Sequence, residues 1–294
     1  MKKKRIHNAA FLLSLLAVMV CNIIDLRSTQ AKEKRQAQLY LVGVGPGDPD
    51  HATLQAIKVI NESDLIVCSR GVKERFGIYV KNKEVIEAPP GLWRCYEQSP
   101  TTSAQRARTD LNELRKALDR VINNMRQAIK QQKTVAVLSS GDPLLYGPWK
   151  WCLEEFSDLS PVVIPGLSCF NAASAALKKD PTHAPYTKSV ILTAGDLPAE
   201  TDTIDRLATH KTSMIFFTMN IDLADLVKKL SGHYSPRTPV AIVIDAGYKD
   251  SERVLHGTLQ NIESKIANNG HSLKAFNYLF YVGDFLSHSL KANR

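Results

Sequence analysis

Residues 39–49 have the sequence Leu-Tyr-Leu-Val-Gly-Val-Gly-Pro-Gly-Asp-Pro. The apolar run 39–44 predicts a buried strand, and the turn behind it predicts that the chain passes directly into a helix. Asp50 is expected to cap that helix. The turn lacks the last glycine of the dinucleotide pattern G-x-G-x-x-G, and its two prolines have no amide donor, so a phosphate cradle is disfavoured.

Beyond this unit, short apolar runs alternate with amphipathic stretches. The runs predicted as strands are 64–68, 134–138, 161–164, 189–193, 214–218, 240–245 and 278–282. The stretches predicted as helices are 105–131, 149–156, 168–177, 221–230 and 259–267. Residues 71–103 are expected to be irregular, and residues 200–212 to form a surface connection. The alternation predicts an α/β fold with largely parallel strand pairing.

The composition is that of a globular protein. The chain has 294 residues, of which 44% are hydrophobic and 23% are charged, and this excludes a disordered or collagen-like chain. The net charge of +9 is concentrated at the N-terminus, because residues 1–38 hold eight Lys or Arg and two acidic residues. The remaining body is close to neutral, so no nucleic-acid partner is expected. The five cysteines show no CxxC spacing, which disfavours a disulfide framework and a metal site.

The N-terminal segment has the pattern of a targeting sequence. Lys2-Lys3-Lys4-Arg5 precedes an apolar run, 9–24, that is shorter than the roughly 20 residues needed to span a bilayer. This pattern predicts a signal peptide or signal anchor, and hence a membrane-anchored or exported protein with membrane contact through residues 9–24. The alternatives are a buried helix of the fold, or a cytoplasmic protein whose true start lies near Met19 or later. The predicted division of the chain is 1–37, 38–165 and 166–294.

Two further glycine- and proline-rich loops follow predicted strands, where open α/β sheets bind ligands. The first is 139–147, Ser-Ser-Gly-Asp-Pro-Leu-Leu-Tyr-Gly, in which Asp142 lies between glycine and proline with an exposed carboxylate expected. The second is 164–168, Ile-Pro-Gly-Leu-Ser. Ser168 is predicted to cap a helix, because the nucleophile pattern G-x-S-x-G is absent.

Five segments in this order resemble the tetrapyrrole methylase family, the S-adenosylmethionine-dependent enzymes of corrin and sirohaem synthesis. They are 40–49, 141–147, 163–168, 238–243 and 255–259. The resemblance covers residues 38–286. It implies two α/β domains with S-adenosyl-L-methionine in the cleft between them, a tetrapyrrole substrate and a homodimer.

The resemblance also implies which residues contact the cofactor. They are Pro46, Ser140, Gly141, Asp142, Leu145, Ser168, Cys169, Met219 and Gly247. Ser140, Gly141 and Asp142 are expected to hold polar groups of the amino acid or ribose. Met219 and Gly247 are expected to line the adenine side. The cofactor has a sulfonium and a carboxylate but no phosphate, so backbone groups and one carboxylate suffice.

One departure from the family leaves the catalytic residue unassigned. Family members that methylate uroporphyrinogen carry an aspartate at the end of the second strand, where this chain has Cys68-Ser69-Arg70. An enamine carbon of a reduced tetrapyrrole is already nucleophilic, so a strong base is not required. Because tetrapyrrole precursors carry many carboxylates, the cations of residues 70–108 are candidate substrate contacts. Those predicted to bind substrate are Arg70, Arg94 and Arg106; Lys73, Arg75 and Arg108 belong to the same group.

The leading hypothesis is a methyltransferase acting on a tetrapyrrole, specifically a cobalamin (corrin) precursor. One alternative keeps the fold and cofactor but methylates a non-tetrapyrrole acceptor. A second is a non-catalytic tetrapyrrole-binding protein at the membrane, which the serine at position 69 and the export-type N-terminus favour.

Overall fold

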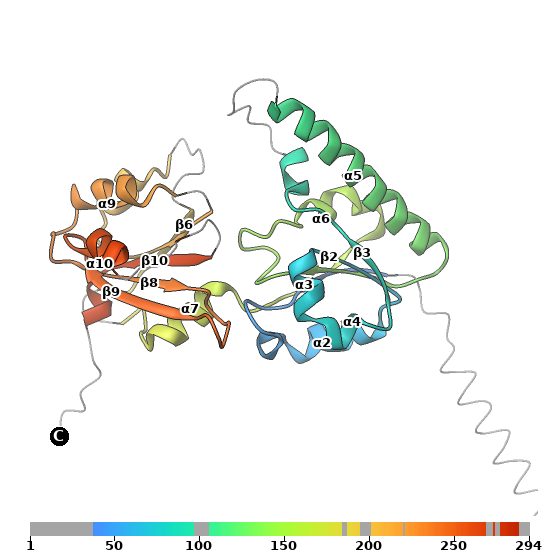
Figure 1. Cartoon of the computed structure of the whole chain (residues 1–294), viewed down its shortest axis with the longest axis horizontal. Coiled ribbons are helices and arrows are strands. Elements are labelled where there is room, and N and C mark those ends of the chain that lie inside the picture. The colour runs from blue at the N-terminus through green and yellow to red at the C-terminus, as the bar shows by residue number, and fades with distance from the viewer. Residues whose placement is uncertain are drawn as a thin grey trace, which may run out of the picture.

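The computed structural model describes residues 38–96, 106–183, 187–194, 201–219, 221–268, 273 and 277–287. Figure 1 shows two bodies, each a sheet with helices, one coloured mainly blue to green and the other yellow to red. The predicted α/β fold is confirmed. The predicted domain boundary at residues 165 and 166 falls between the two sheets, and it stays a prediction.

The first sheet is entirely parallel, with strand order β3-β2-β4-β1-β5. Its strands are β1 (Leu39–Gly43), β2 (Leu65–Cys68), β3 (Glu84–Glu87), β4 (Val135–Ser139) and β5 (Val162–Ile164). Its helices are α2 (Leu54–Glu62), α3 (Arg70–Arg75), α4 (Gly77–Val80), α5 (Arg106–Lys130) and α6 (Trp151–Glu155), with 3-10 turns η1 (Pro49–His51), η2 (Leu92–Cys95) and η3 (Ser157–Leu159). Helices cover both faces, so the central strands are continuously apolar.

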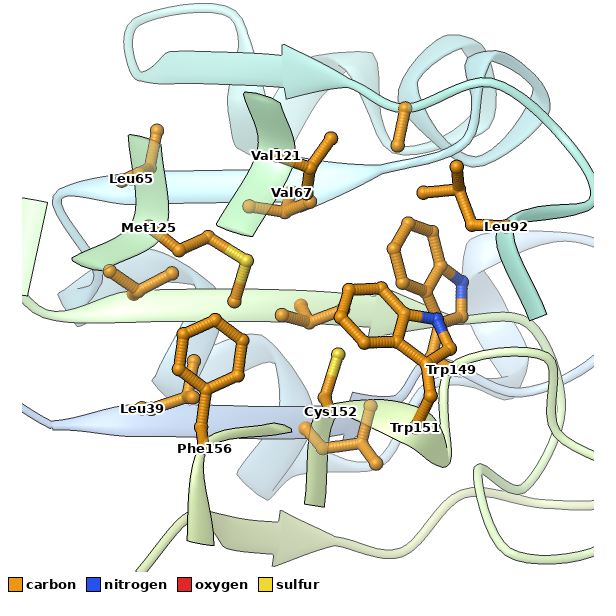
Figure 2. Close-up of a cluster of buried hydrophobic side chains, with 14 of the residues drawn as sticks. Leu39, Leu65, Val67, Leu92, Val121, Met125, Trp149, Trp151, Cys152 and Phe156 are labelled. Atoms are coloured by element: carbon orange, nitrogen blue, oxygen red, sulfur yellow. The ribbon is translucent and has the colours of Figure 1, made fainter. Parts of the chain in front are cut away.

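The core on one face of this sheet is formed by α5 and α6 (Figure 2). Val121 and Met125 of α5 and Phe156, next to α6, pack against the β strands. Cys152 is buried in the same cluster, and Cys68 is buried on the opposite face. Burial raises the pKa of Cys68 to about 11, so its thiol stays protonated at neutral pH. Both cysteines act as small apolar side chains.

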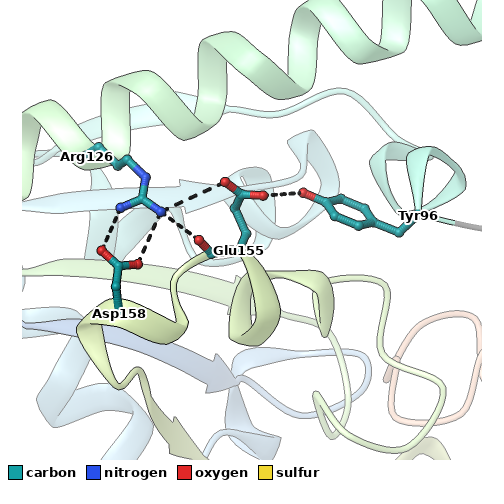
Figure 3. A network of polar contacts seen from close by, with 4 residues as sticks. All are labelled: Tyr96, Arg126, Glu155 and Asp158. Atoms are coloured by element: carbon teal, nitrogen blue, oxygen red, sulfur yellow. Dashed lines mark hydrogen bonds and ion pairs between the residues drawn. The ribbon is translucent and has the colours of Figure 1, made fainter.

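A polar network fastens α6 and η3 to α5 (Figure 3). The Arg126 guanidinium donates to both carboxylate oxygens of Asp158, at 3.0 and 3.2 Å, and to the Glu155 carbonyl at 2.7 Å. Its face lies 4.8 Å from the ring centroid of Phe156. The Tyr96 hydroxyl donates to the Glu155 carboxylate at 3.1 Å. These contacts are confined to the first sheet's layer of helices.

The second sheet is mixed, with order β6-β7-β10-β8-β9. Its strands are β6 (Val190–Ala194), β7 (Ser213–Phe217), β8 (Pro239–Ile244), β9 (Arg253–Thr258) and β10 (Tyr278–Val282). Its helices are α7 (Cys169–Leu177), α8 (Ile204–Ala208), α9 (Leu223–Ser231) and α10 (Ile262–Asn268), with η4 (Asp284–Ser287). Only β6 and β7 pair in parallel. The prediction of largely parallel pairing is therefore wrong here, because β10 inserts antiparallel between β7 and β8.

The elements that sequence analysis missed are short or carry charged ends. Residues 71–103 contain α3, α4, β3 and η2 rather than irregular chain, and α8 lies in the segment expected to be a connection. β9 was missed because it is a partly exposed edge strand. Asp50 does not cap α2: Pro49 begins a 3-10 turn, and the Thr53 hydroxyl instead accepts from the Ala56 amide at 3.0 Å.

The predicted membrane location is corrected by the structure. Within the described residues, none of the helices combines the length and apolar character needed to cross a bilayer. The apolar run 9–24 that motivated the prediction lies outside the described residues. The prediction of a membrane-anchored or exported protein is therefore wrong for the part of the chain that the structure describes.

Replacing Gly43 with alanine should destabilise the fold. Its Cβ would lie 2.5 Å from the Gly166 amide nitrogen and 2.8 Å from Pro143 Cδ, so the loops behind β1 must shift. We expect the free energy of unfolding in urea to fall by about 1–3 kcal/mol. Gly71→Ala is the matched control, because nothing lies within 4 Å of that Cβ and the site is helical. Equal stability of the two variants would contradict the packing described.

Candidate functional site

The three glycine-rich loops meet backbone against backbone. The Gly141 amide donates to the Gly45 carbonyl at 2.9 Å, and the Gly45 amide returns a bond to the Gly141 carbonyl at 3.4 Å. Both glycines have positive φ, +77° and +75°, which other residues rarely adopt. A Cβ on Gly166 would lie 2.4 Å from the Gly141 carbonyl oxygen. The loops thus form one unit at the carboxyl ends of β1, β4 and β5.

A cleft of about 450 Å³ separates this loop unit from the second sheet. It lies where the end of β8 and the start of β10 face the ends of β1 and β4. Its lining residues come from both sheets: Pro46, Gly47, Ser140, Gly141, Cys169, Val243, Asp245, Ala246, Tyr248, Ser251, Asn277, Tyr278 and Leu279. A Cβ on Gly141 would meet nothing within 4 Å, so a ligand can approach this backbone closely.

The two sides of the cleft are joined by hydrogen bonds. The Asp48 amide donates to the Gly247 carbonyl at 2.9 Å, and the Lys249 amide donates to the Asp48 carboxylate at 2.9 Å. The Lys249 ammonium also donates to Asp50 at 2.5 Å. This bond lowers the pKa of Asp50, although both side chains are largely exposed and the pair adds little stability. Gly247, predicted to line the adenine side, belongs to this joint.

Arg75, the last residue of α3, lies at the corner of the cleft. Its Nη1 donates to the Gly47 carbonyl, its Nη2 donates to Ser140 Oγ at 3.4 Å, and its Nε donates to the Gly71 carbonyl at 3.1 Å. Its guanidinium carbon lies 5.4 Å from the ring centroid of Tyr248. The sequence grouped Arg75 with candidate substrate contacts, whereas the structure gives it three neutral acceptors and an aromatic face.

Asp245 supplies a carboxylate among the lining residues, and sequence analysis did not select it. It follows β8 with φ of +49°, and its amide donates to the Asn277 carbonyl at 2.7 Å. Within the described residues, its carboxylate receives no hydrogen bond and forms no ion pair. The available signal was its position at the end of the strand predicted over 240–245. A half-buried carboxylate of this kind can hold a cation or hydroxyl groups.

Four of the nine predicted cofactor residues line the cleft: Pro46, Ser140, Gly141 and Cys169. Cys169 begins α7 and is half-buried, and burial raises the pKa of its thiol. Leu145 and Met219 pack against the core under the second sheet instead.

Ser168 and Asp142 organise the loops. Ser168 caps α7, as predicted: the Phe170 amide donates to its hydroxyl at 3.2 Å, and its own amide donates to Asn171 Oδ1 at 3.0 Å. Asp142 Oδ1 accepts from the amides of Leu144 and Leu145, at 2.8 and 3.2 Å. Asp142 Oδ2 accepts from the Gly166 amide at 3.4 Å, which links the second loop to the third. Direct cofactor contact by either residue stays a prediction.

Of the three predicted substrate cations, Arg70 and Arg94 do not line this cleft, and the side chain of Arg106 lies outside what the structure describes. Arg70 is exposed and pairs with Glu74 at 2.9 Å, and this hydrogen bond raises the pKa of Arg70. Arg94 lies in η2, and Arg106 is the first residue of α5. Their contact with substrate stays a prediction.

Residues 38–263 match the sequence model of the family described as Tetrapyrrole (Corrin/Porphyrin) Methylases. The chain belongs to this family. A cobalt-precorrin-4 C(11)-methyltransferase of Methanocaldococcus jannaschii is 31% identical, over 85% of this chain and 88% of that protein. A siroheme synthase of Nitrosospira multiformis is 25% identical over 79% of this chain, and the match spans only 46% of that longer protein.

Solved structures show the same fold. A cobalt precorrin-4 methyltransferase superposes with a TM-score of 0.69 at 21% identity, covering 86% of this chain and 98% of that one. A uroporphyrin-III C-methyltransferase from Thermus thermophilus, complexed with S-adenosylhomocysteine, superposes with a TM-score of 0.59 at 19% identity. The match covers 85% of this chain and 99% of that one. The predicted family is confirmed, together with the methyltransferase activity and the S-adenosyl-L-methionine cofactor that it implies. The predicted homodimer stays a prediction.

The cleft suits this cofactor. Its volume falls in the range of small-molecule sites, and polar groups sit among apolar walls. The open face of Gly141 admits a ligand against the backbone, and Asp245 offers a negative charge to a cationic donor.

Replacing Asp142 with alanine should loosen the loop unit, because three amides lose their acceptor. We expect the free energy of unfolding to fall by about 1–3 kcal/mol in urea titrations. Asp142→Asn retains one acceptor oxygen, so its free energy of unfolding should fall less. The control is Asp119→Ala, an exposed position on α5, which should match the wild type or slightly exceed it. If Asp142→Ala unfolds with the same free energy as the wild type, the carboxylate does not organise the loops.

Proposed function

We propose that the chain transfers a methyl group from S-adenosyl-L-methionine, bound in the cleft between the two sheets, to a cobalamin (corrin) precursor. The observation that carries the choice of acceptor is the extent of the match to the cobalt-precorrin-4 methyltransferase, which spans nearly the whole of both chains. Against siroheme synthases, the chain spans about half of the relatives' length.

The end of the second strand supports the same acceptor. Ser69 follows β2 and precedes α3, at the position where family members that methylate uroporphyrinogen carry aspartate. Its hydroxyl makes no capping bond to α3. The proposed acceptor therefore has to be nucleophilic without a carboxylate base at this position.

The residues proposed to bind the cofactor are the cleft-lining residues whose groups suit S-adenosyl-L-methionine. Pro46 and Gly141 border it along the first sheet, Ser140 offers a hydroxyl, and Cys169 contacts it from α7. Asp245 faces the donor with a negative charge. When bound, S-adenosyl-L-methionine supplies a methyl group on a positively charged sulfur.

The protein's contribution is positioning. In-line displacement requires acceptor carbon, methyl and sulfur to be aligned, and fixing that geometry supplies much of the rate enhancement of such reactions. The joined glycine loops hold the first-sheet wall rigid, and the joint at Asp48 and Gly247 fixes the second wall against it. The cleft thus presents a preset surface to the donor.

The activity is tested with purified protein, labelled S-adenosyl-L-methionine and two acceptors, a cobalt-precorrin-4 preparation and uroporphyrinogen III. We expect label in the corrin precursor and little in uroporphyrinogen III. Label only in uroporphyrinogen III contradicts the proposed acceptor. Cofactor binding without transfer to either acceptor also contradicts the proposed acceptor and favours a different methyl acceptor.

The role of Asp245 is tested with Asp245→Asn. Removing the carboxylate should raise the dissociation constant of S-adenosyl-L-methionine about ten-fold, equivalent to about 1.4 kcal/mol, because its negative charge no longer attracts the positively charged sulfonium. The effect on S-adenosylhomocysteine, which lacks that charge, should be clearly smaller in calorimetry. Asp250→Asn is the matched control on the same loop, because Asp250 is exposed and outside the lining. Equal effects on both ligands contradict a role for the charge.

A further inference from the structure

We propose that Arg75 is a positioning residue that sets the shape of the cofactor cleft by tying both of its walls to α3. The inference rests on the proposed cofactor site. Gly47 and Ser140 lie on the first-sheet wall of the cleft and Tyr248 lies on the second-sheet wall. The guanidinium of Arg75 contacts all three.

The side chain is held in place from its own helix. Nε donates to the Gly71 carbonyl at 3.1 Å, one turn back along α3. This bond leaves the two terminal nitrogens directed at the loops, with Nη1 on the Gly47 carbonyl and Nη2 on Ser140 Oγ. A planar group with several donors can serve these acceptors together, whereas a lysine ammonium is a compact point charge on a flexible stem.

The bond to Gly47 acts on a loop with little freedom of its own. Gly47 has φ of +67°, and its absent Cβ would lie 2.0 Å from the Gly247 carbonyl oxygen. On one side, therefore, the loop is in close backbone contact with Gly247, which follows the second-sheet strand β8. Arg75 fixes the carbonyl on the other side, so the wall at Pro46 and Gly47 cannot move independently of α3.

The contact with Tyr248 links the second wall to the same group. The guanidinium carbon lies 5.4 Å from the ring centroid, within the range of a cation–π interaction. Within the described residues, Arg75 has no carboxylate partner. Its acceptors are the carbonyls of Gly71 and Gly47 and the hydroxyl of Ser140. Its role therefore depends on the geometry of the planar guanidinium and of the Tyr248 ring rather than on an ion pair.

The closing experiment compares Arg75→Lys with the wild type and with Arg126→Lys. Arg126 is the matched control, because its guanidinium also combines several hydrogen bonds with an aromatic face but lies in the network of α5 and α6 (Figure 3). For each protein, calorimetry gives the dissociation constant of S-adenosylhomocysteine, methyl-transfer kinetics give KM for the donor and kcat, and urea gives the free energy of unfolding.

We expect Arg75→Lys to raise the dissociation constant and KM about ten-fold, with kcat changed less than three-fold and unfolding nearly unchanged. Arg126→Lys should lower the free energy of unfolding and leave binding as in the wild type. Tyr248→Leu should weaken binding in the same direction, and Tyr248→Phe, which keeps the ring, should not. Millimolar methylguanidine should restore part of the binding lost in Arg75→Ala.

Two failures are distinguishable. If the wild type binds S-adenosylhomocysteine and Arg75→Lys binds it equally well, this inference is wrong and the proposed function stands. If Arg75→Lys loses binding only in proportion to lost stability, as Arg126→Lys would, Arg75 is a structural residue and the inference is again wrong. If the wild type itself does not bind, the proposed function fails and this inference fails with it.

Discussion

The site depends on one steric constraint, the close approach of three loop backbones at the ends of β1, β4 and β5. Gly43, Gly141 and Gly166 lie so close that a Cβ on Gly43 or Gly166 would overlap its neighbours' backbone. The paired amides and carbonyls of Gly45 and Gly141 add directional bonds to this contact. Because the loops are in contact, their other faces form one continuous wall, and Gly141 is open on the side that faces the cleft.

The second sheet is joined to the loop unit at the cleft by a small set of polar bonds, in addition to the apolar contact of Leu145 with the core of the second sheet. The bonds between Asp48, Gly247 and Lys249 use mainly backbone groups, so they fix distance and direction at little cost in buried charge. Arg75 adds a side-chain tie at the same corner. An inter-sheet cleft with fixed walls is well suited to a reaction that relies on alignment of donor and acceptor.

Asp142 and Asp245 divide between them the roles that the sequence assigned to one carboxylate. Asp142 is occupied by three backbone amides and acts on the loops. Asp245 lines the cleft, and its carboxylate has no hydrogen-bond partner among the described residues. The two residues lie in loops of different sheets, and of the two only Asp245 lines the cleft. The glycine-rich motif drew attention to Asp142, whereas no local motif marks Asp245.

Local pattern was sufficient for most elements and for the family. The run 39–49, the periodic apolar face of α5 and the cap at Ser168 are set by residues within a few positions of one another, so the sequence alone determined them. The antiparallel insertion of β10 between β7 and β8, the bond from the Gly166 amide to Asp142 and the position of Asp245 opposite the glycine loops needed the tertiary structure. Each of these depends on contacts between segments far apart in the chain, and such contacts leave no periodic signal in the sequence that precedes or follows them.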